Sequence, residues 1–156
     1  MITHLQAAAL LAALHHISAF SIAGALAAEL ALLQPSPSLA QARRLQRLDL
    51  LYGIAAVVLL AVGLCRVAYF EKGWSYYWHD TFFVAKLLTF AAVGLLSIYP
   101  TVVFLSWSAG LRGGVAPQLP AATYRRVRWC LRLEVAGVLI IVVCAALMAR
   151  GLGYRG

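Results

Sequence analysis

The stretch LLYGIAAVVLLAVGLCRVAYF, residues 50–70, decides the fold class, because it carries a single charged side chain, Arg66. A helix of about 20 residues spans about 30 Å, which is the thickness of the hydrocarbon core of a bilayer. Three further apolar stretches lie outward from it, at residues 5–33, 82–107 and 135–149. The sequence therefore predicts an all-α integral membrane protein, an up-down four-helix bundle that forms a single domain over residues 1–156.

Composition supports this interpretation and excludes several classes of protein. Hydrophobic residues make up 63% of the chain and charged residues only 12%, which is too apolar for an ordinary water-soluble domain. The longest polar connection, residues 108–128, is too short to bury a core of its own. We therefore expect the bilayer as partner, no nucleic acid, and no separate soluble catalytic domain. Any function must lie between the helices.

The two ends of the spans differ in charge. The net charge is +8, and eight of the 13 basic residues fall at one end of the predicted spans. They are Arg43, Arg44, Arg47, Arg112, Arg125, Arg126, Arg128 and Arg132. Basic residues mark the cytoplasmic side, so both termini are predicted to face the outer, periplasmic side of a bacterial inner membrane. The aromatic run at Trp74, Tyr76, Tyr77 and Trp78 is then expected at the outer headgroups.

The limits of the first two spans follow from local signals. Pro35 and Pro37 are predicted to end the first span, and Asp49 to begin the second. No Lys or Arg precedes Arg43, and the first apolar run is longer than the core of a signal peptide, so we expect it to remain as a span. The three cysteines, Cys65, Cys130 and Cys144, are scattered and indicate neither a disulfide framework nor a zinc site.

Ionisable residues inside the spans divide into two sets by depth. Lipid solvates charge poorly, so such side chains face the bundle interior and require partners. Glu29, Asp49 and Glu134 lie near the inner ends, at the depth of Arg43, Arg47, Arg128 and Arg132, and are expected to form an ion-pair cluster there. The outer set contains His15, His16, Arg66 and Lys86, two histidines and two cations with no buried acid nearby.

A bound haem would provide partners for the histidines and cations of the outer set. Its iron takes a histidine nitrogen, its macrocycle packs on apolar walls, and its propionates pair with Arg or Lys. His15 or His16 is the candidate metal ligand, and Arg66 and Lys86 are candidates for binding the propionates. Adjacent helical residues point about 100° apart, so both histidines cannot ligate one iron. The alternative is a buried histidine that is simply hydrogen-bonded to a neighbouring helix.

Several short motifs carry a resemblance to a known family. They are LHHISAF at 14–20, DLLYG at 49–53, GLCRV at 63–67, FEKG at 70–73, FVAK at 83–86 and SIYPT at 97–101. The chain resembles the domain-of-unknown-function 2214 family of predicted bacterial membrane proteins over nearly its whole length. That resemblance implies a membrane protein and no particular reaction.

A more distant similarity is to the HemJ-type protoporphyrinogen oxidases, which are four-helix haem b proteins. The pattern that matches is a histidine in the first span followed by Ile17, a glycine in the second span and Lys86 in the third. The similarity implies haem b ligation by His16 and a functional role for Lys86. The chain departs from that pattern by adding His15, by placing Arg66 at the end of the second span, and in the connection at residues 71–74.

Three functions remain in competition at this point. The first is a haem-dependent redox protein, with Lys86 and His15 as candidate catalytic residues, porphyrinogen oxidation as its most specific form, and a quinone, a porphyrin or a respiratory-chain protein as partner. The second is a non-catalytic membrane assembly or interaction subunit, which could form homo-oligomers. The third is a small proton-coupled transporter, since His15, Ile22 and Glu29 recur at heptad spacing along one helix face.

Overall fold

Helices form nearly all of the protein. The structure, a computed structural model, describes residues 3–155 and has no strand among them. Four long helices are α1 (His4–Leu32), α2 (Leu39–Tyr69), α4 (Thr81–Ser106) and α6 (Ala121–Ala149), and two short ones are α3 (Gly73–Trp78) and α5 (Ser108–Arg112). Each long helix is long and apolar enough to cross a membrane. The prediction of an all-α protein with four spans is confirmed.

The starts of the first two long helices are fixed by capping boxes. The Thr3 hydroxyl accepts from the backbone N–H of Gln6 at the start of α1, and the Ser38 hydroxyl accepts from that of Gln41 at the start of α2. The prediction that α2 begins at Asp49 is wrong, because Ser38 supplies the cap earlier in the chain. The basic residues that precede Asp49 therefore lie on helix α2 and not in a connecting loop.

The connections also contain more helix than expected. The segment after α2 contains α3, which begins at Gly73, a residue in the left-handed region with a φ of 81°. The connection between α4 and α6 begins with α5, and the basic segment from Ala121 is the first part of α6. These short helices satisfy backbone groups that a loop at the membrane edge would leave to water.

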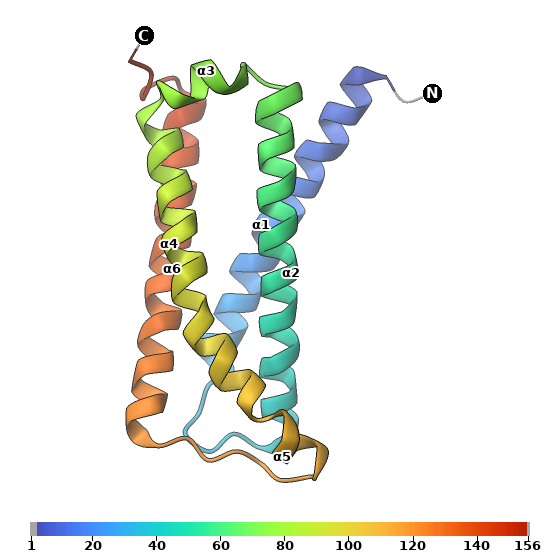
Figure 1. The fold of residues 1–156 in the computed structure, drawn as a ribbon, viewed down its shortest axis with the longest axis vertical. Helices are drawn as coiled ribbons and strands as arrows, with labels where there is room; N and C mark the ends of the chain where they lie inside the picture. The colour runs from blue at the N-terminus through green and yellow to red at the C-terminus, as the bar shows by residue number, and fades with distance from the viewer. Residues whose placement is uncertain (1–2, 156) are drawn as a thin grey trace.

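The long helices are arranged as two antiparallel pairs. Helix α1 packs on α2 and α4 packs on α6, while α1 with α6 and α2 with α4 join the pairs (Figure 1). Both ends of the chain and α3 lie at one end of the bundle, called here the termini end, and α5 lies at the opposite end. The first half of α1 diverges from the other helices toward the termini end. The bundle is therefore open in one half and closed in the other.

The closed half contains the larger hydrophobic core. Phe104, Leu45, Val127 and Leu131 are completely buried there, and α1 contributes Leu26. A smaller cluster of Val67, Tyr77 and Phe83 lies at the termini end. Close approach of α4 to α6 depends on Gly137, because a methyl group at that position would overlap the side chain of Val93.

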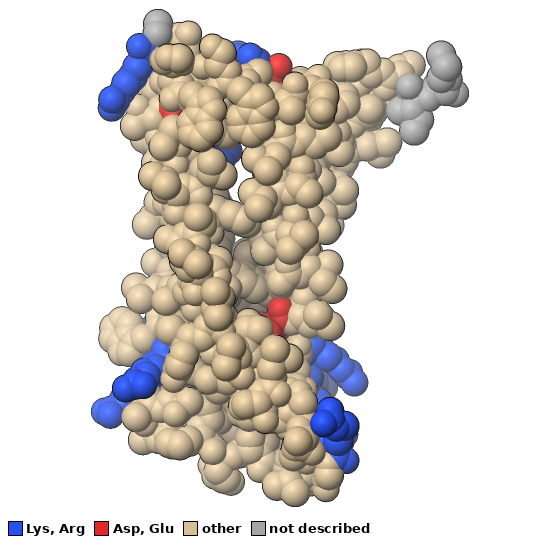
Figure 2. All heavy atoms as spheres, in the orientation of Figure 1, with Lys and Arg blue, Asp and Glu red and all other residues tan. Residues whose placement is uncertain are grey.

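Most basic side chains lie at one end of the bundle, although Lys72, Arg150 and Arg155 lie at the termini end. Basic side chains gather at the opposite end, and a hollow separates the two helix pairs in the half toward the termini (Figure 2). The basic residues of that end lie on α2, α5 and α6, and they are Arg43, Arg44, Arg47, Arg112, Arg125, Arg126, Arg128 and Arg132.

Candidate functional site

The candidate site is a cavity of about 320 Å³ in the termini half of the bundle. All four long helices line it, together with Glu71 and Tyr77 from the segment between α2 and α4. The four residues singled out in the sequence all reach this cavity, and they are His15, His16, Arg66 and Lys86. Its walls are mostly apolar, formed by Leu59, Leu60, Leu64, Val67, Phe83, Leu87, Phe90, Ile141, Ala145 and Met148.

His15 is half-buried on α1 and faces α2. A methyl group added at Gly63 would lie 3.3 Å from its Cε1 atom, so the glycine leaves room for the imidazole. The Nδ1 atom of His15 is buried and has no hydrogen-bond partner among the described residues. A buried nitrogen without a partner is costly, which makes His15 a candidate for contact with a bound ligand.

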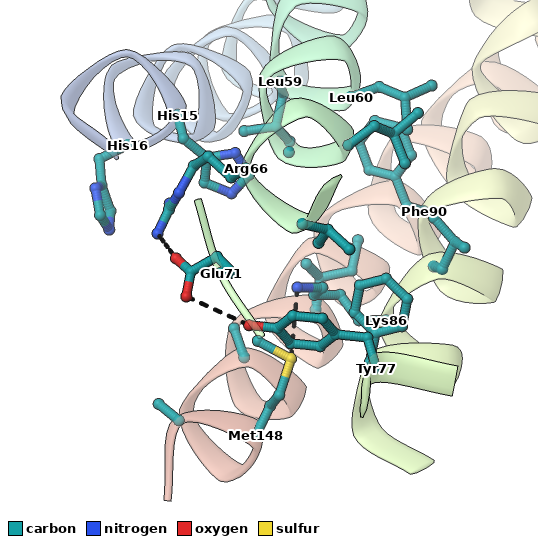
Figure 3. A pocket seen from close by; sticks show the side chains of 18 residues that line it. His15, His16, Leu59, Leu60, Arg66, Glu71, Tyr77, Lys86, Phe90 and Met148 are labelled. Atoms are coloured by element: carbon teal, nitrogen blue, oxygen red, sulfur yellow. Dashed lines mark hydrogen bonds and ion pairs between the residues drawn. The ribbon is translucent and has the colours of Figure 1, made fainter. Parts of the chain in front are cut away.

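His16 is exposed and points away from Lys86, although it also borders the cavity (Figure 3). Its Nδ1 atom lies 2.7 Å from the carbonyl oxygen of Ala12, so Nδ1 is the donor of that hydrogen bond. A histidine held in this way has its electron pair on Nε2, which is the arrangement commonly found in metal-ligating histidines. The rings of His15 and His16 are edge-on, with centroids 6.1 Å apart.

Lys86 brings an unpaired ammonium group to the other side of the cavity. Its Nζ atom lies 3.8 Å from the sulfur of Met148 and 5.3 Å from the centre of the Phe83 ring. Within residues 3–155, no carboxylate oxygen lies within 4.0 Å of it. The ammonium group is half-buried, and its neighbours are a thioether and an aromatic ring. A cation in such surroundings attracts an anionic ligand.

Arg66 is not free, because Glu71, an exposed acid that follows α2, pairs with it; the sequence predicted only that no buried acid lies nearby. The Nη2 atom of Arg66 forms an ion pair of 2.7 Å with Glu71, which also lies 3.5 Å from the hydroxyl of Tyr77 (Figure 3). The turn before α3 folds Glu71 back over the end of α2. Burial, with the added negative charge of Glu71, raises the pKa of Tyr77 to about 12, so its phenol stays a neutral donor.

A second group of ionisable residues lies deeper in the closed half. It consists of Glu29 on α1, Asp49 on α2 and Glu134 on α6, called here the carboxyl cluster. Their exposed fractions are 1%, 8% and 1%. The hydroxyl of Thr101, on α4, donates a hydrogen bond of 2.7 Å to Asp49.

The predicted ion pairs between this cluster and the arginines are wrong. The ion pair of Arg66 with Glu71 is the only one among the described residues. Arg43 instead donates to the carbonyl of Leu111, and Arg128 donates to the hydroxyl of Tyr124. The arginines match the acids in depth, but they project from exposed faces of their helices while the acids face the interior.

Comparison with known proteins identifies the chain at the level of family. The model of the family described as "Predicted membrane protein (DUF2214)" matches residues 7–153. The chain belongs to the DUF2214 family. No curated protein and no solved structure matches this DUF2214 protein.

Sequence reasoning missed two residues of the site in this DUF2214 protein, Glu71 and Met148. Glu71 follows α2 directly, and its place two residues before a glycine was a usable signal for a turn back onto the helix. Met148 lies 62 positions from Lys86 in the chain, and no local pattern connects them.

Proposed function

We propose that this membrane protein binds haem b in the cavity of the termini half and has a redox or electron-transfer role. The observation that carries the proposal is that an unpartnered ring nitrogen on His15 and an unpaired ammonium on Lys86 border the same apolar cavity. Haem would provide partners for both groups, since it offers an electron-accepting iron, a flat apolar macrocycle and anionic propionates.

The lining of the cavity suits such a group. Its volume of about 320 Å³ is at the lower end of the range of about 300–1,000 Å³ that is common for ligand sites, so part of the macrocycle would lie in the open side between the helix pairs. Phe83 and Phe90 provide aromatic surface for a planar ring, and the hollow between the helix pairs leaves an open side.

Two histidines compete as the axial ligand. The resemblance to HemJ-type oxidases implies His16, whose Nε2 carries the electron pair. The geometry favours His15, which is more buried and stands opposite the unpaired Lys86. We assign ligation to His15 on this ground, and the two single variants described below distinguish the candidates.

The other residues have roles that follow from their charge and position. Lys86 would pair with a propionate of bound haem, and Arg66 would do so in competition with Glu71. The histidine that does not ligate can accept a proton at the edge of the cavity, and the apolar walls exclude water. Haem supplies one-electron redox chemistry when bound. Porphyrinogen oxidation is the most specific form of this function, with a quinone or a respiratory-chain protein as the electron acceptor.

The charge distribution orients the proposed site. The basic opposite end faces the cytoplasm by the positive-inside rule, so the cavity and both termini lie on the outer side of a bacterial inner membrane. Helix α3 then places Trp74 and Trp78, stacked at 6.4 Å between ring centroids, at the headgroup level.

Absorption spectroscopy of detergent-purified protein, expressed with a supply of haem precursor, tests the proposal. The wild type is expected to show a Soret band that is lost in His15→Ala. His79→Ala is the matched control, because His79 bonds a backbone carbonyl as His16 does but lies outside the cavity. Loss of the band in His16→Ala alone would move ligation to that residue, and a colourless wild type would overturn the proposal.

A further inference from the structure

The carboxyl cluster contains three acids that have too few hydrogen-bond and ion-pair partners. Glu29, Asp49 and Glu134 come from three different helices and meet in the closed half of the bundle. The Oε1 atoms of Glu29 and Glu134 are buried and have no hydrogen-bond partner among residues 3–155. Figure 2 shows acidic atoms inside the opening between the helix pairs, above the basic end.

No positive charge compensates the cluster. Among the described residues, no Lys, Arg or His nitrogen lies within 4.0 Å of any of the three carboxyl groups. An ionised carboxyl group that is buried without a partner is costly, and further negative charges in the same half of the bundle add to that cost. Three ionised carboxylates are therefore untenable here, and the cluster must bind a proton or another cation.

The groups that face the cluster are all neutral. The Tyr52 hydroxyl on α2 lies beside Glu134, and the Cys130 thiol on α6 lies near the same carboxyl group. From α4, Thr101 donates to Asp49. A hydroxyl donor stabilises one carboxylate but cannot neutralise a second and a third.

A proton fits this environment better than a metal ion. The described residues contain no group of His, Cys, Asp and Glu side chains placed to ligate one metal. A proton needs no coordination shell, because it forms one O–H bond on a single carboxylate oxygen. We propose that Glu29, Asp49 and Glu134 form an intramembrane proton-binding site.

The site exchanges its proton with the basic end of the protein. Asp49 is the most exposed of the three acids and lies two residues from Arg47 on α2, which is about 3 Å of depth. Glu29 is separated from His15 by about 21 Å along α1, and the buried side chains of Ile22, Ala25 and Leu26 intervene. The proton therefore comes from water at the basic end and returns there, independently of the cavity.

Infrared spectroscopy of the purified protein, in H₂O and in D₂O, tests this assignment. The wild type at neutral pH is expected to show the carbonyl stretch of protonated carboxylic acid, shifted on deuteration. Glu29→Gln and Glu134→Gln should each lose part of that band. Glu71→Gln is the control, because Glu71 is an ion-paired acid at the other end, and it should retain the full band.

Three results would overturn the assignment. The first is a wild type with no protonated carboxyl band at neutral pH, a measurement that remains decisive even if a variant fails to fold. The second is a band unchanged in both glutamate variants. The third is a band abolished by sodium chloride but not by choline chloride, which would show a sodium site instead. Haem-free protein is expected to give the same band, so failure of the haem proposal leaves this one standing.

Discussion

The two halves of the bundle bury ionisable side chains under opposite conditions. In the termini half, the cations and histidines of the outer set border a cavity of about 320 Å³. In the closed half, the three acids of the carboxyl cluster are buried beside a hydrophobic core that includes Phe104 and Leu131. Each half therefore leaves charge of one sign uncompensated, and the termini half has a cavity of ligand size beside its cations and histidines.

The difference in space comes from the divergence of one helix. Helix α1 contacts α2 and α6, yet its first half leans away from the bundle (Figure 1). Where the helices converge, side chains fill the gap between the pairs, and where they separate, a cavity remains. The chemistry that each half can support is set by this geometry as much as by its residues.

The largest effect on stability is expected when a buried side chain is removed from the core of the closed half. Phe104→Ala should lower the free energy of unfolding by about 3–5 kcal/mol, because a completely buried aromatic ring is lost. Phe90→Ala, at the cavity wall, is the matched control and should cost clearly less, since its ring is already beside empty space. Thermal unfolding in detergent measures both, and equal losses would contradict the contrast between a packed and an open half.

An intermediate effect on stability is expected at Lys86, where substitution should stabilise the protein and not destabilise it. Replacement by Met should stabilise ligand-free protein by about 1–3 kcal/mol, because an unpaired polar group leaves the apolar cavity. The same variant should lose haem occupancy. Lys72→Met is the control, since Lys72 is exposed at the same end and lies over the ring of Tyr76. Destabilisation by Lys86→Met would show that the ammonium has a partner within the protein.

The smallest effect is expected at the half-exposed ion pair. Glu71→Gln should change stability by about 0.2–1 kcal/mol, because the side chains of Arg66 and Glu71 are 24% and 35% exposed. It should also lower the pKa of Tyr77 from about 12, since a nearby negative charge disfavours the phenolate. An ultraviolet titration of tyrosinate measures this shift, and an unchanged Tyr77 would leave burial as its sole cause.

Much of the fold could be predicted from local patterns. The four spans follow from runs of apolar residues, and the end of α1 follows from the prolines at 35 and 37. The meeting of His15, Arg66 and Lys86 at one depth was also predictable, because depth along a helix is a count of residues. The start of α2 was not, since Asp49 and Ser38 are both good capping residues and only the course of the chain selects between them.

The sequence by itself determined the number of spans, the concentration of eight of the 13 basic residues at one end, and the depth of each ionisable group. The tertiary structure decided the partners: Glu71 for Arg66, Thr101 for Asp49, and no carboxylate for Lys86. The reason is physical. Position along a helix axis follows from a fixed rise of about 1.5 Å per residue, whereas the direction in which a side chain points into the bundle depends on how neighbouring helices pack and rotate.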